Sequence, residues 1–334
     1  MDLSAAEIQV LASLEKAATE NEPTDRASLE ASADRFWIFR ENWSGAYPSL
    51  VTKGLIDGDA EGYRLTEAGR PLAQAYHRQR PDMYWYYYQE FYQSARPSAA
   101  HSELCERVFG EDLCQEGQTD MASLKDLLDI LDLKQDEHLL DLGCGAGGIA
   151  EYISDQTGVS ATGLDYAAPA IDEANQRTAD KRSRLTFVQG DMNALNLPAR
   201  SFDAVISLDT LYWVSDLEET LSKLLAALKP GGRMAIFMNH HIGEGGDPAE
   251  LAPHCTDLSK ALGALGVSFE TSDYTVQIGE FWQRNWQAAT ALQTAFEAEG
   301  NGFIAASLIR ESEEDYLPDI KAGRIARHLY HLRT

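Results

Sequence analysis

The stretch His138–Gly148, with the sequence HLLDLGCGAGG, runs from a short apolar segment into a cluster of glycines. Leu139, Leu140 and Leu142 supply the apolar side chains, and residues 149–157 continue as a predicted helix. A strand, a glycine turn and a helix in this order form the first ligand-binding turn of a doubly wound α/β sheet. Glycines at such a turn let backbone N–H groups approach a ligand that a Cβ atom would displace. We therefore expect the main ligand of the chain at this turn.

Two kinds of nucleoside ligand are compatible with the turn. Gly143, Gly145 and Gly148 spell the G-x-G-x-x-G pattern of dinucleotide sites, which leaves an NAD-dependent oxidoreductase as one alternative. Asp141 ends the predicted strand just before the first glycine. A carboxylate there would repel the phosphates of NAD, but it suits the ammonium and sulfonium groups of S-adenosylmethionine (SAM), which carries no phosphate. The position of this acid favours SAM.

The pattern Asp141-x-Gly143-x-Gly145-x-Gly147 resembles motif I of the class I SAM-dependent methyltransferases. Cys144 lies inside the turn, where only a small side chain fits. The resemblance implies an α/β fold with a doubly wound, mostly parallel, seven-stranded sheet and SAM as the cofactor. Regular alternation of strand and helix patterns supports this fold. We expect strands at 138–142, 160–165, 185–189, 202–207, 233–238, 267–271 and 327–332, and helices at 149–157, 167–179, 216–228 and 251–265.

Further candidates for cofactor binding fall at the predicted carboxyl ends of the strands, where ligands of such sheets bind. Asp165 ends the second strand, and its carboxylate can accept both ribose hydroxyls, while Tyr166 can pack on the adenine. By the resemblance, Asp191 accepts the adenine amino group and Met192 lines the adenine pocket. Ser207 ends the fourth strand, which in the family passes beneath the sulfonium.

Two segments before the sheet supply more candidates. The segment that contains Phe109 and Gln115 resembles the WGxxxHxG lead-in of tocopherol, sterol and amino-sugar methyltransferases, with these two residues in place of the family's Trp and His. That lead-in lies over the methionine end of SAM, so Gln115 is a candidate cofactor contact. Residues 81–94 are dense in aromatic side chains. Among them, Tyr92 is a candidate cofactor contact through cation–π attraction, and Tyr88 is a candidate substrate contact.

Methyl transfer from SAM requires the protein mainly to position the two reactants, since the methyl group is already activated by the positive sulfur. A base is needed only if the acceptor must lose a proton. His240 and His241, after the fifth predicted strand, are the candidate bases. Asp209 can instead orient an amine, and we expect transfer to nitrogen or oxygen rather than to carbon. Tyr212 and Trp213 are predicted to shape the acceptor pocket.

Residues 1–80 form a separate predicted unit of mainly helical character. Helical patterns, one of them over 29–39, precede the stretch GYRLTEAGR at 62–70, which resembles the wing of a winged helix-turn-helix. The unit holds 9 Lys+Arg and 13 Asp+Glu, and this net charge of 9 − 13 = −4 disfavours DNA binding, which depends on phosphate contacts. We expect the unit to form a homodimer contact or to wall off the substrate. A ligand-sensing transcriptional regulator with a methyltransferase fold remains the alternative.

Residues 81–334 form the predicted methyltransferase domain. It divides into N-terminal cap helices at 81–135, a SAM-binding core at 136–240 and a lid insertion at 280–322. The lid is expected between the last two strands of the sheet. The acceptor is therefore expected between the carboxyl edge of the sheet and a roof formed by the cap and the lid.

The overall charge disfavours several classes of partner. The chain has 28 Lys+Arg against 53 Asp+Glu, a formal net charge of −25, so binding to nucleic acid or to an anionic membrane is not expected. The 4 cysteines include no C-x-x-C pair, so neither a disulfide framework nor a metal site is predicted. No basic, apolar leader or membrane-length apolar run is present in the sequence, and a cytoplasmic location is expected. These features favour a small-molecule substrate.

Overall fold

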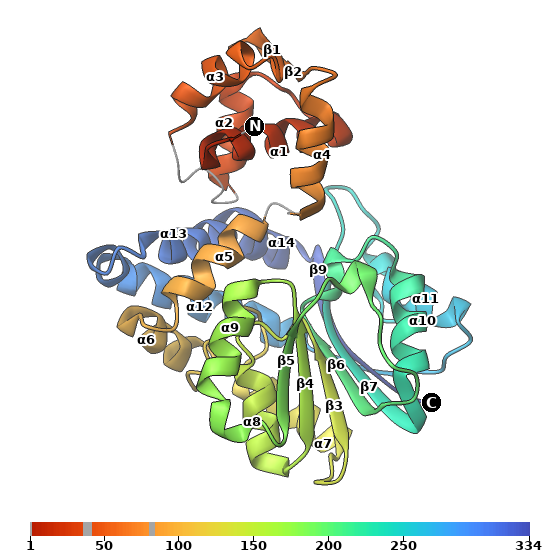
Figure 1. Cartoon of the computed structure of the whole chain (residues 1–334). Helices are drawn as coiled ribbons and strands as arrows, with labels where there is room; N and C mark the ends of the chain where they lie inside the picture. Colours follow the sequence, from red (N-terminus) through yellow and green to blue (C-terminus); the bar gives the residue numbers. More distant parts are fainter. Residues whose placement is uncertain (1, 36–41, 80–83) are drawn as a thin grey trace. The chain divides into compact units, whose positions relative to one another are not determined.

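The computed structural model describes residues 2–35, 42–79 and 84–334 (Figure 1). Contacts divide the chain into two units, Met1–Phe91 and Tyr92–Thr334. Their boundary falls inside helix α5 (Tyr84–Ser94), further along the chain than the boundary predicted at residue 80. Each unit has its own hydrophobic core.

The first unit combines helices with an antiparallel hairpin. Its described elements are α1 (Ala5–Glu20), α2 (Arg26–Arg35), α3 (Ala46–Thr52), β1 (Ile56–Asp59), β2 (Gly62–Leu65) and α4 (Gly69–Gln79). The predicted helix at 29–39 corresponds to α2 as far as residue 35, and residues 36–39 lie outside the described part of the chain. Leu11, Trp43 and Tyr47 are buried in the core of this unit. The hairpin falls where the wing is expected, and the winged-helix assignment stays a prediction.

The second unit consists of one sheet with helices on both faces. Its first helices after α5 are α6 (Ala99–Val108) and α7 (Met121–Leu131). The strands are β3 (His138–Leu142), β4 (Ser160–Asp165), β5 (Leu185–Gln189), β6 (Phe202–Leu208), β7 (Leu228–His241), β8 (Glu270–Asp273) and β9 (Ile325–Arg333). The helices between them are α8 (Gly148–Thr157), α9 (Ala168–Arg177), α10 (Leu217–Ala227), α11 (Asp257–Ala264), α12 (Thr275–Ala298), α13 (Gly302–Arg310) and α14 (Leu317–Ala322).

The strand order β5-β4-β3-β6-β7-β9-β8 gives, within the described residues, one 7-stranded sheet. Strand β3 pairs in parallel with β4 and with β6, whereas β9 is antiparallel to both of its neighbours. The predicted fold class is therefore confirmed. Because β3, β4 and β6 run in the same direction, their carboxyl ends meet at one edge of the sheet, and that edge is where a ligand of such a fold binds.

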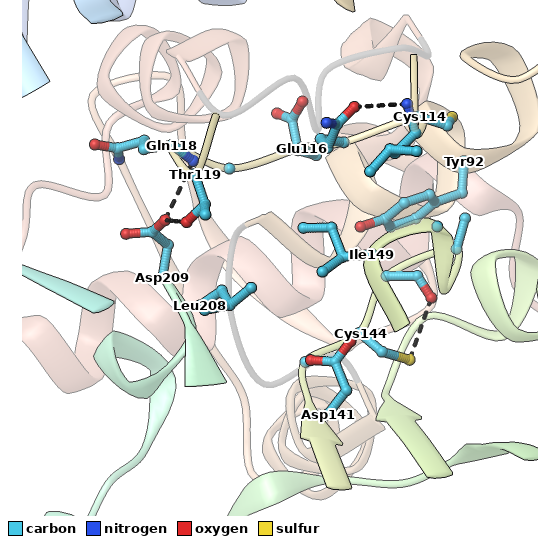
Figure 2. A pocket seen from close by; sticks show the side chains of 17 residues that line it. Tyr92, Cys114, Glu116, Gln118, Thr119, Asp141, Cys144, Ile149, Leu208 and Asp209 are labelled. Carbon is cyan, nitrogen blue, oxygen red and sulfur yellow. Dashed lines mark hydrogen bonds between the residues drawn. The ribbon is translucent and has the colours of Figure 1, made fainter. Parts of the chain in front are cut away.

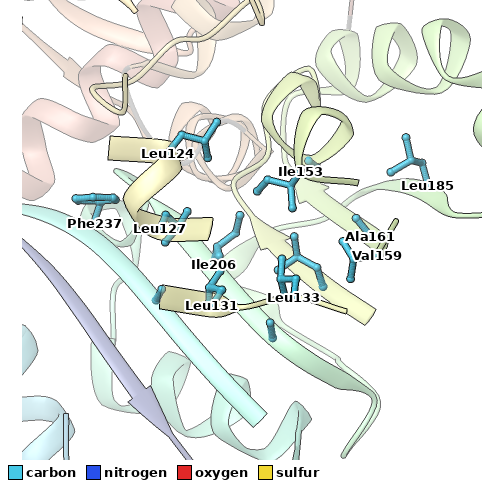
Figure 3. Packing of buried hydrophobic residues seen from close by; sticks show 14 of the residues in the cluster. Leu124, Leu127, Leu131, Leu133, Ile153, Val159, Ala161, Leu185, Ile206 and Phe237 are labelled. Atoms are coloured by element: carbon cyan, nitrogen blue, oxygen red, sulfur yellow. The ribbon is translucent and has the colours of Figure 1, made fainter. Parts of the chain in front are cut away.

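Side chains alternate between the two faces of the sheet, and each face has its own cluster of buried apolar residues. Leu139 and Ile206 pack with α7 and α8 in one cluster, which Figure 3 shows. Leu140 and Val205, their neighbours in sequence, pack with α10 and α11 in the other. This alternation is the period of two that a strand imposes. Figure 1 shows α8 and α9 on one side of the strands and α10 and α11 on the other.

Two predicted strands differ from the observed ones by three residues or more at an end. Strand β7 begins at Leu228 rather than at 233, and it runs to His241, beyond the predicted end at 238, because β9 pairs with it to the end, His241 opposite Ile325. Strand β8 begins at Glu270 rather than at 267, because its pairing with β9 begins at Glu270, opposite His331. The helices from α12 to α14 occupy the interval between β8 and β9, where the lid is predicted. No helix among the described residues is long and apolar enough to cross a bilayer.

Candidate functional site

A pocket lies at the carboxyl ends of β3 and β6 (Figure 2). The glycine turn after β3 and the segment 113–119 ahead of α7 form two of its walls. The predicted site residues that line it are Tyr92, Gln115, Asp141, Gly143, Cys144, Gly145 and Asp209. Residues far apart in the sequence therefore converge at the edge where the fold predicts a ligand.

The glycine turn has a backbone conformation and close neighbours that leave no room for a side chain at two of its positions. Gly145 has φ +53°, and a Cβ atom on it would lie 2.4 Å from the hydroxyl oxygen of Tyr92. Gly147 has φ +71° and is the N-cap of helix α8, and a Cβ atom there would lie 2.3 Å from the Phe187 ring. L-residues with a side chain rarely adopt such positive φ values. The turn therefore requires glycine at both positions.

Two buried carboxyl groups stand beside this turn. Asp165 accepts hydrogen bonds from the backbone N–H of Gly145 at 2.9 Å and of Ala167 at 2.9 Å, so it braces the turn. Burial, together with the negative charge of Asp165, raises the pKa of Asp141 to about 7. Burial likewise raises the pKa of Asp165 and holds the pKa of the Cys144 thiol well above its usual range. A cationic ligand would relieve the cost of ionising Asp141.

Gln115 faces the same pocket with an unused hydrogen-bond donor. Its Oε1 accepts from the backbone N–H of Leu113 at 2.9 Å, which fixes the orientation of the amide. Its Nε2 is buried and has no hydrogen-bond partner in the structure. A buried donor without a partner costs about 1–3 kcal/mol, and a ligand acceptor in the pocket would relieve this cost.

The composition of the lining separates the two candidate cofactors. The described residues that line the pocket include the acids Glu116 and Asp141, together with Asp209, whose charge is paired with Arg327 from outside the lining, but no lysine or arginine. A dinucleotide would bring two phosphates to this acidic surface, and like charges repel. A ligand with an ammonium, a sulfonium and one carboxylate fits better, because the acids match its cations and the Gln115 amide matches its carboxylate. The site therefore fits SAM.

Asp209 is held at the end of β6 by a buried arginine. Arg327 on β9 donates from Nη1 to Oδ1 and from Nη2 to Oδ2 of Asp209, the latter at 2.8 Å. The hydroxyls of Thr119 and Tyr212 also donate to this carboxylate, at 3.3 Å and 3.2 Å. Burial opposes the charge of Arg327, but Asp209 outweighs it and raises the pKa of the guanidinium. Both charges are thereby neutralised within the protein.

Gln118 connects three parts of the second unit. Its Oε1 accepts from Asn239 Nδ2 on β7 at 2.6 Å and from Trp282 Nε1 on α12 at 3.2 Å. Its Nε2 donates to the Tyr316 hydroxyl at 3.0 Å, and the Trp282 and Tyr316 rings stack with centroids 3.8 Å apart. Tyr316 ends a π-helical segment, Glu311–Tyr316, between α13 and α14. One amide therefore links the pocket wall, the sheet and the lid helices.

Other predicted residues are not among the described residues that line the pocket. Ser207 is buried, and its hydroxyl oxygen lies 2.6 Å from the hydroxyl oxygen of Thr210. Met192 is buried, and Asp191 is exposed, where it caps a short helix by accepting from the Asn193 N–H. Asp165, the last residue of β4, also lies outside the lining, and so do Gly147, Tyr166, Tyr212 and Trp213, which follow the strands around the pocket. Tyr88 belongs to the first unit, and its substrate role stays a prediction.

The two predicted bases lie on opposite faces of β7. His240 Nε2 and the Tyr330 hydroxyl are 2.9 Å apart, on the face that carries α11. Burial lowers the pKa of His240 to about 3, so this imidazole is neutral near pH 7 and only weakly basic. His241 lies on the same face of β7 as Asn239, and its Nδ1 is 3.6 Å from Oδ2 of Asp319. Burial lowers the pKa of His241 as well. Neither histidine is among the described residues lining the pocket.

The sequence interpretation missed the residues that support the pocket from a distance. The sequence indicated Arg327 only as the start of the last strand, and it gave no signal for Gln118, Thr119 or Asn239. An arginine as the first residue of a predicted strand was the one available signal, because a charge that the sheet buries needs a partner. The partner itself, Asp209, lies 118 positions earlier in the chain.

Comparison with known proteins points to one family. A family model described as a methyltransferase domain matches residues 140–236, which run from within β3 to within β7. A phosphoethanolamine N-methyltransferase from Triticum aestivum is 29% identical over 148 residues, which cover 44% of this chain and 28% of the relative. A 27-O-demethylrifamycin SV methyltransferase from Amycolatopsis mediterranei is 31% identical over 149 residues, covering 41% of this chain and 54% of the relative. The chain thus spans about a quarter to a half of the length of these relatives.

A solved structure extends the likeness beyond the core. Haemonchus contortus phosphoethanolamine N-methyltransferase 2, in complex with phosphomonomethylethanolamine and S-adenosylhomocysteine, has a TM-score of 0.60 and 18% sequence identity. The alignment covers 74% of this chain and 60% of that chain. At this identity the likeness shows a shared fold.

Proposed function

We propose that this chain is a class I SAM-dependent methyltransferase and that it transfers the SAM methyl group to the nitrogen or oxygen of a small molecule. The observation that carries the proposal is the pocket at the carboxyl edge of β3 and β6, which is acidic, lacks basic residues among its described lining, and holds the buried amide donor of Gln115.

The residues around the glycine turn are proposed to hold the cofactor. Asp141 would attract a cationic group, and Gln115 Nε2 would donate to the carboxylate at the methionine end. Asp165 braces the turn through its bond to Gly145 and is proposed to accept a ribose hydroxyl as well. The ring of Tyr92 lies against the turn and would face the sulfonium. Bound SAM supplies a methyl group on a positively charged sulfur, which a nucleophile displaces in line.

The acceptor is proposed to bind on the side of the pocket formed by Leu208, Asp209 and Gln118. Arg327 fixes the Asp209 carboxylate, and Gln118 ties this wall to Trp282 and Tyr316 of the lid helices. These residues would position the acceptor and exclude water, and positioning alone can supply roughly 7–11 kcal/mol of the barrier. Because His240 is weakly basic and faces away, an amine that reaches the pocket already deprotonated is the simplest acceptor.

The names of the relatives leave the acceptor atom open, since one is an N-methyltransferase and the other acts on a 27-O-demethyl compound. The test is therefore a screen. The full chain is incubated with methyl-labelled SAM and separate sets of amines, phenols and phosphorylated amino alcohols, and products are identified by mass. We expect labelled product with at least one amine or phenol set. Binding of SAM in a calorimeter with no transfer to any set would contradict the proposed transfer, and failure to bind SAM would contradict the assignment to the SAM-dependent methyltransferases.

A further inference from the structure

A second group of reactive side chains lies outside the residues assigned above. His101 and Cys105 are on helix α6, and Asp112 is in the segment that follows it. Each of the three residues offers one potential ligand atom, and these three atoms lie within 4.8 Å of one another. His101 and Cys105 are 1% and 0% exposed, so this is a buried cluster.

The local structure brings these three groups together. The spacing of His101 and Cys105 places both side chains on one face of α6, and the Cys105 Sγ lies 3.7 Å from Nδ1 and 3.8 Å from Nε2 of His101. The Asp112 carboxylate is fixed from the other side, because its Oδ1 accepts from the Cys114 N–H at 2.9 Å. Thiolate, imidazole and carboxylate are the three ligand types that zinc takes in proteins.

The distances suit a small tetrahedral ion. Zinc bonds of about 2.0–2.3 Å place neighbouring ligand atoms about 3.4–3.6 Å apart. The sulfur and imidazole atoms of the cluster nearly meet this spacing already. Closing the widest separation of 4.8 Å requires a movement of about 1 Å. Asp112 can supply it, because it is in a loop rather than in a helix.

We propose that His101, Cys105 and Asp112 form a binding site for Zn²⁺, with a fourth position open to water. The site lies at the start of the pocket wall, because Asp112 holds Cys114, and residues 113–119 line the pocket. A bound ion would tie that wall to helix α6 and stabilise its folded conformation. The sequence did not indicate this site, since the three residues have none of the spacings that identify zinc motifs.

The test measures metal retention by the full chain without reference to methyl transfer. The reduced protein is exposed to Zn²⁺, desalted and analysed by mass spectrometry for zinc, and Co²⁺ is titrated separately to observe a thiolate-to-metal charge-transfer band. We expect about one zinc per chain, the cobalt band and a higher thermal midpoint with Zn²⁺. Cys105→Ser should weaken zinc binding about 100-fold or more, whereas Cys255→Ser, which removes an exposed cysteine outside the cluster, should leave it unchanged.

The proposal is overturned if the wild-type chain retains no zinc, or if Cys105→Ser and the wild type retain it equally. Cys105 is fully buried, so circular dichroism must show that the variant folds. If Cys105→Ser does not fold, Asp112→Asn is used instead. Asp112 is only half-buried, and asparagine keeps an oxygen for the Cys114 N–H. Unchanged zinc affinity in a folded Asp112→Asn chain would exclude the three-ligand site.

Discussion

The Asp209 carboxylate and the Arg327 guanidinium form a buried two-point ion pair at the edge of the pocket. Their side chains are 5% and 2% exposed. Asp209 follows β6 with a left-handed backbone, φ +60°, and Arg327 comes from β9, with its guanidinium 4.8 Å from the Phe237 ring centroid. The pair therefore fixes the proposed acceptor side of the pocket through a strand that is distant in sequence.

Removing one charge of this pair should destabilise the second unit strongly. In Asp209→Asn the Arg327 cation remains buried without its counter-charge, and such a loss costs about 3–5 kcal/mol. Asparagine tolerates the positive φ of this position, so backbone strain does not confound the result. Urea unfolding followed by circular dichroism measures the change. The double variant Asp209→Asn with Arg327→Met should recover part of the loss, because it leaves no unpaired charge.

An exposed ion pair provides the matched comparison. Glu103 and Arg107 pair on the surface of α6, with side chains 52% and 45% exposed. Glu103→Gln should change the free energy of unfolding by less than about 1 kcal/mol, because solvent screens such pairs. Equal effects of Glu103→Gln and Asp209→Asn would show that the Asp209–Arg327 pair has no special role.

Cofactor binding should depend on pH through Asp141. Burial, followed by the Asp165 charge, raises the pKa of Asp141 to about 7, so the free protein holds this carboxyl largely protonated below pH 7. A cation in the pocket favours the carboxylate, and SAM binding therefore releases a proton. Affinity should rise with pH up to about 7, by at most about tenfold per pH unit, and level off above it. Calorimetry between pH 5.5 and 8.5 measures this profile.

The control for this prediction is Asp141→Asn, which keeps the size of the side chain and cannot ionise. Its SAM affinity should be lower at pH 8, and its profile should retain only the titration of SAM itself. If the wild-type and Asp141→Asn profiles are parallel across the range, another group is responsible for the pH dependence.

The sheet and the cofactor side of the site could be predicted from the sequence because their signals are local. The apolar run, Asp141 and the glycines of the turn lie within one short stretch, and each strand carries its own hydrophobic pattern. Each predicted strand overlaps a strand of the observed sheet, and Asp141 and Gly145 line the pocket. Backbone geometry over a few residues was enough to place them.

The acceptor side could not be predicted in the same way because it depends on pairings between distant strands. Arg327 meets Asp209 only because β9 inserts beside β7 in antiparallel register. The same register extends β7 to His241, so His240 occupies a strand position and turns to the face opposite Asn239. Sequence order placed both histidines just after the strand, and it did not reveal which face each side chain takes.

The Nε2 donor of Gln115 should contribute to cofactor affinity. This donor is buried without a partner, so losing the donor itself costs the free protein little. Gln115→Met removes the donor without burying a charge, and loss of the bond from the Leu113 N–H costs about 1–3 kcal/mol of stability. We expect SAM affinity to fall about tenfold or more in a variant that circular dichroism shows to be folded. An unaltered dissociation constant would exclude this residue from the carboxylate end of the cofactor.

Gly145 should be irreplaceable for two separable reasons, its positive φ and the contact with Tyr92. Gly145→Ala adds a Cβ atom 2.4 Å from the Tyr92 hydroxyl oxygen at φ +53°, so both the turn and the ring must move. Gly300→Ala isolates the first reason, because Gly300 has φ +77° and nothing within 4 Å of its Cβ position. Backbone strain of this kind costs about 1–2 kcal/mol. We expect Gly300→Ala to lower the free energy of unfolding by this strain cost alone. Gly145→Ala should lower it by more than this cost and should abolish measurable SAM binding. Adding Tyr92→Phe to Gly145→Ala should recover part of the excess, and no recovery would mean that the hydroxyl does not crowd the turn.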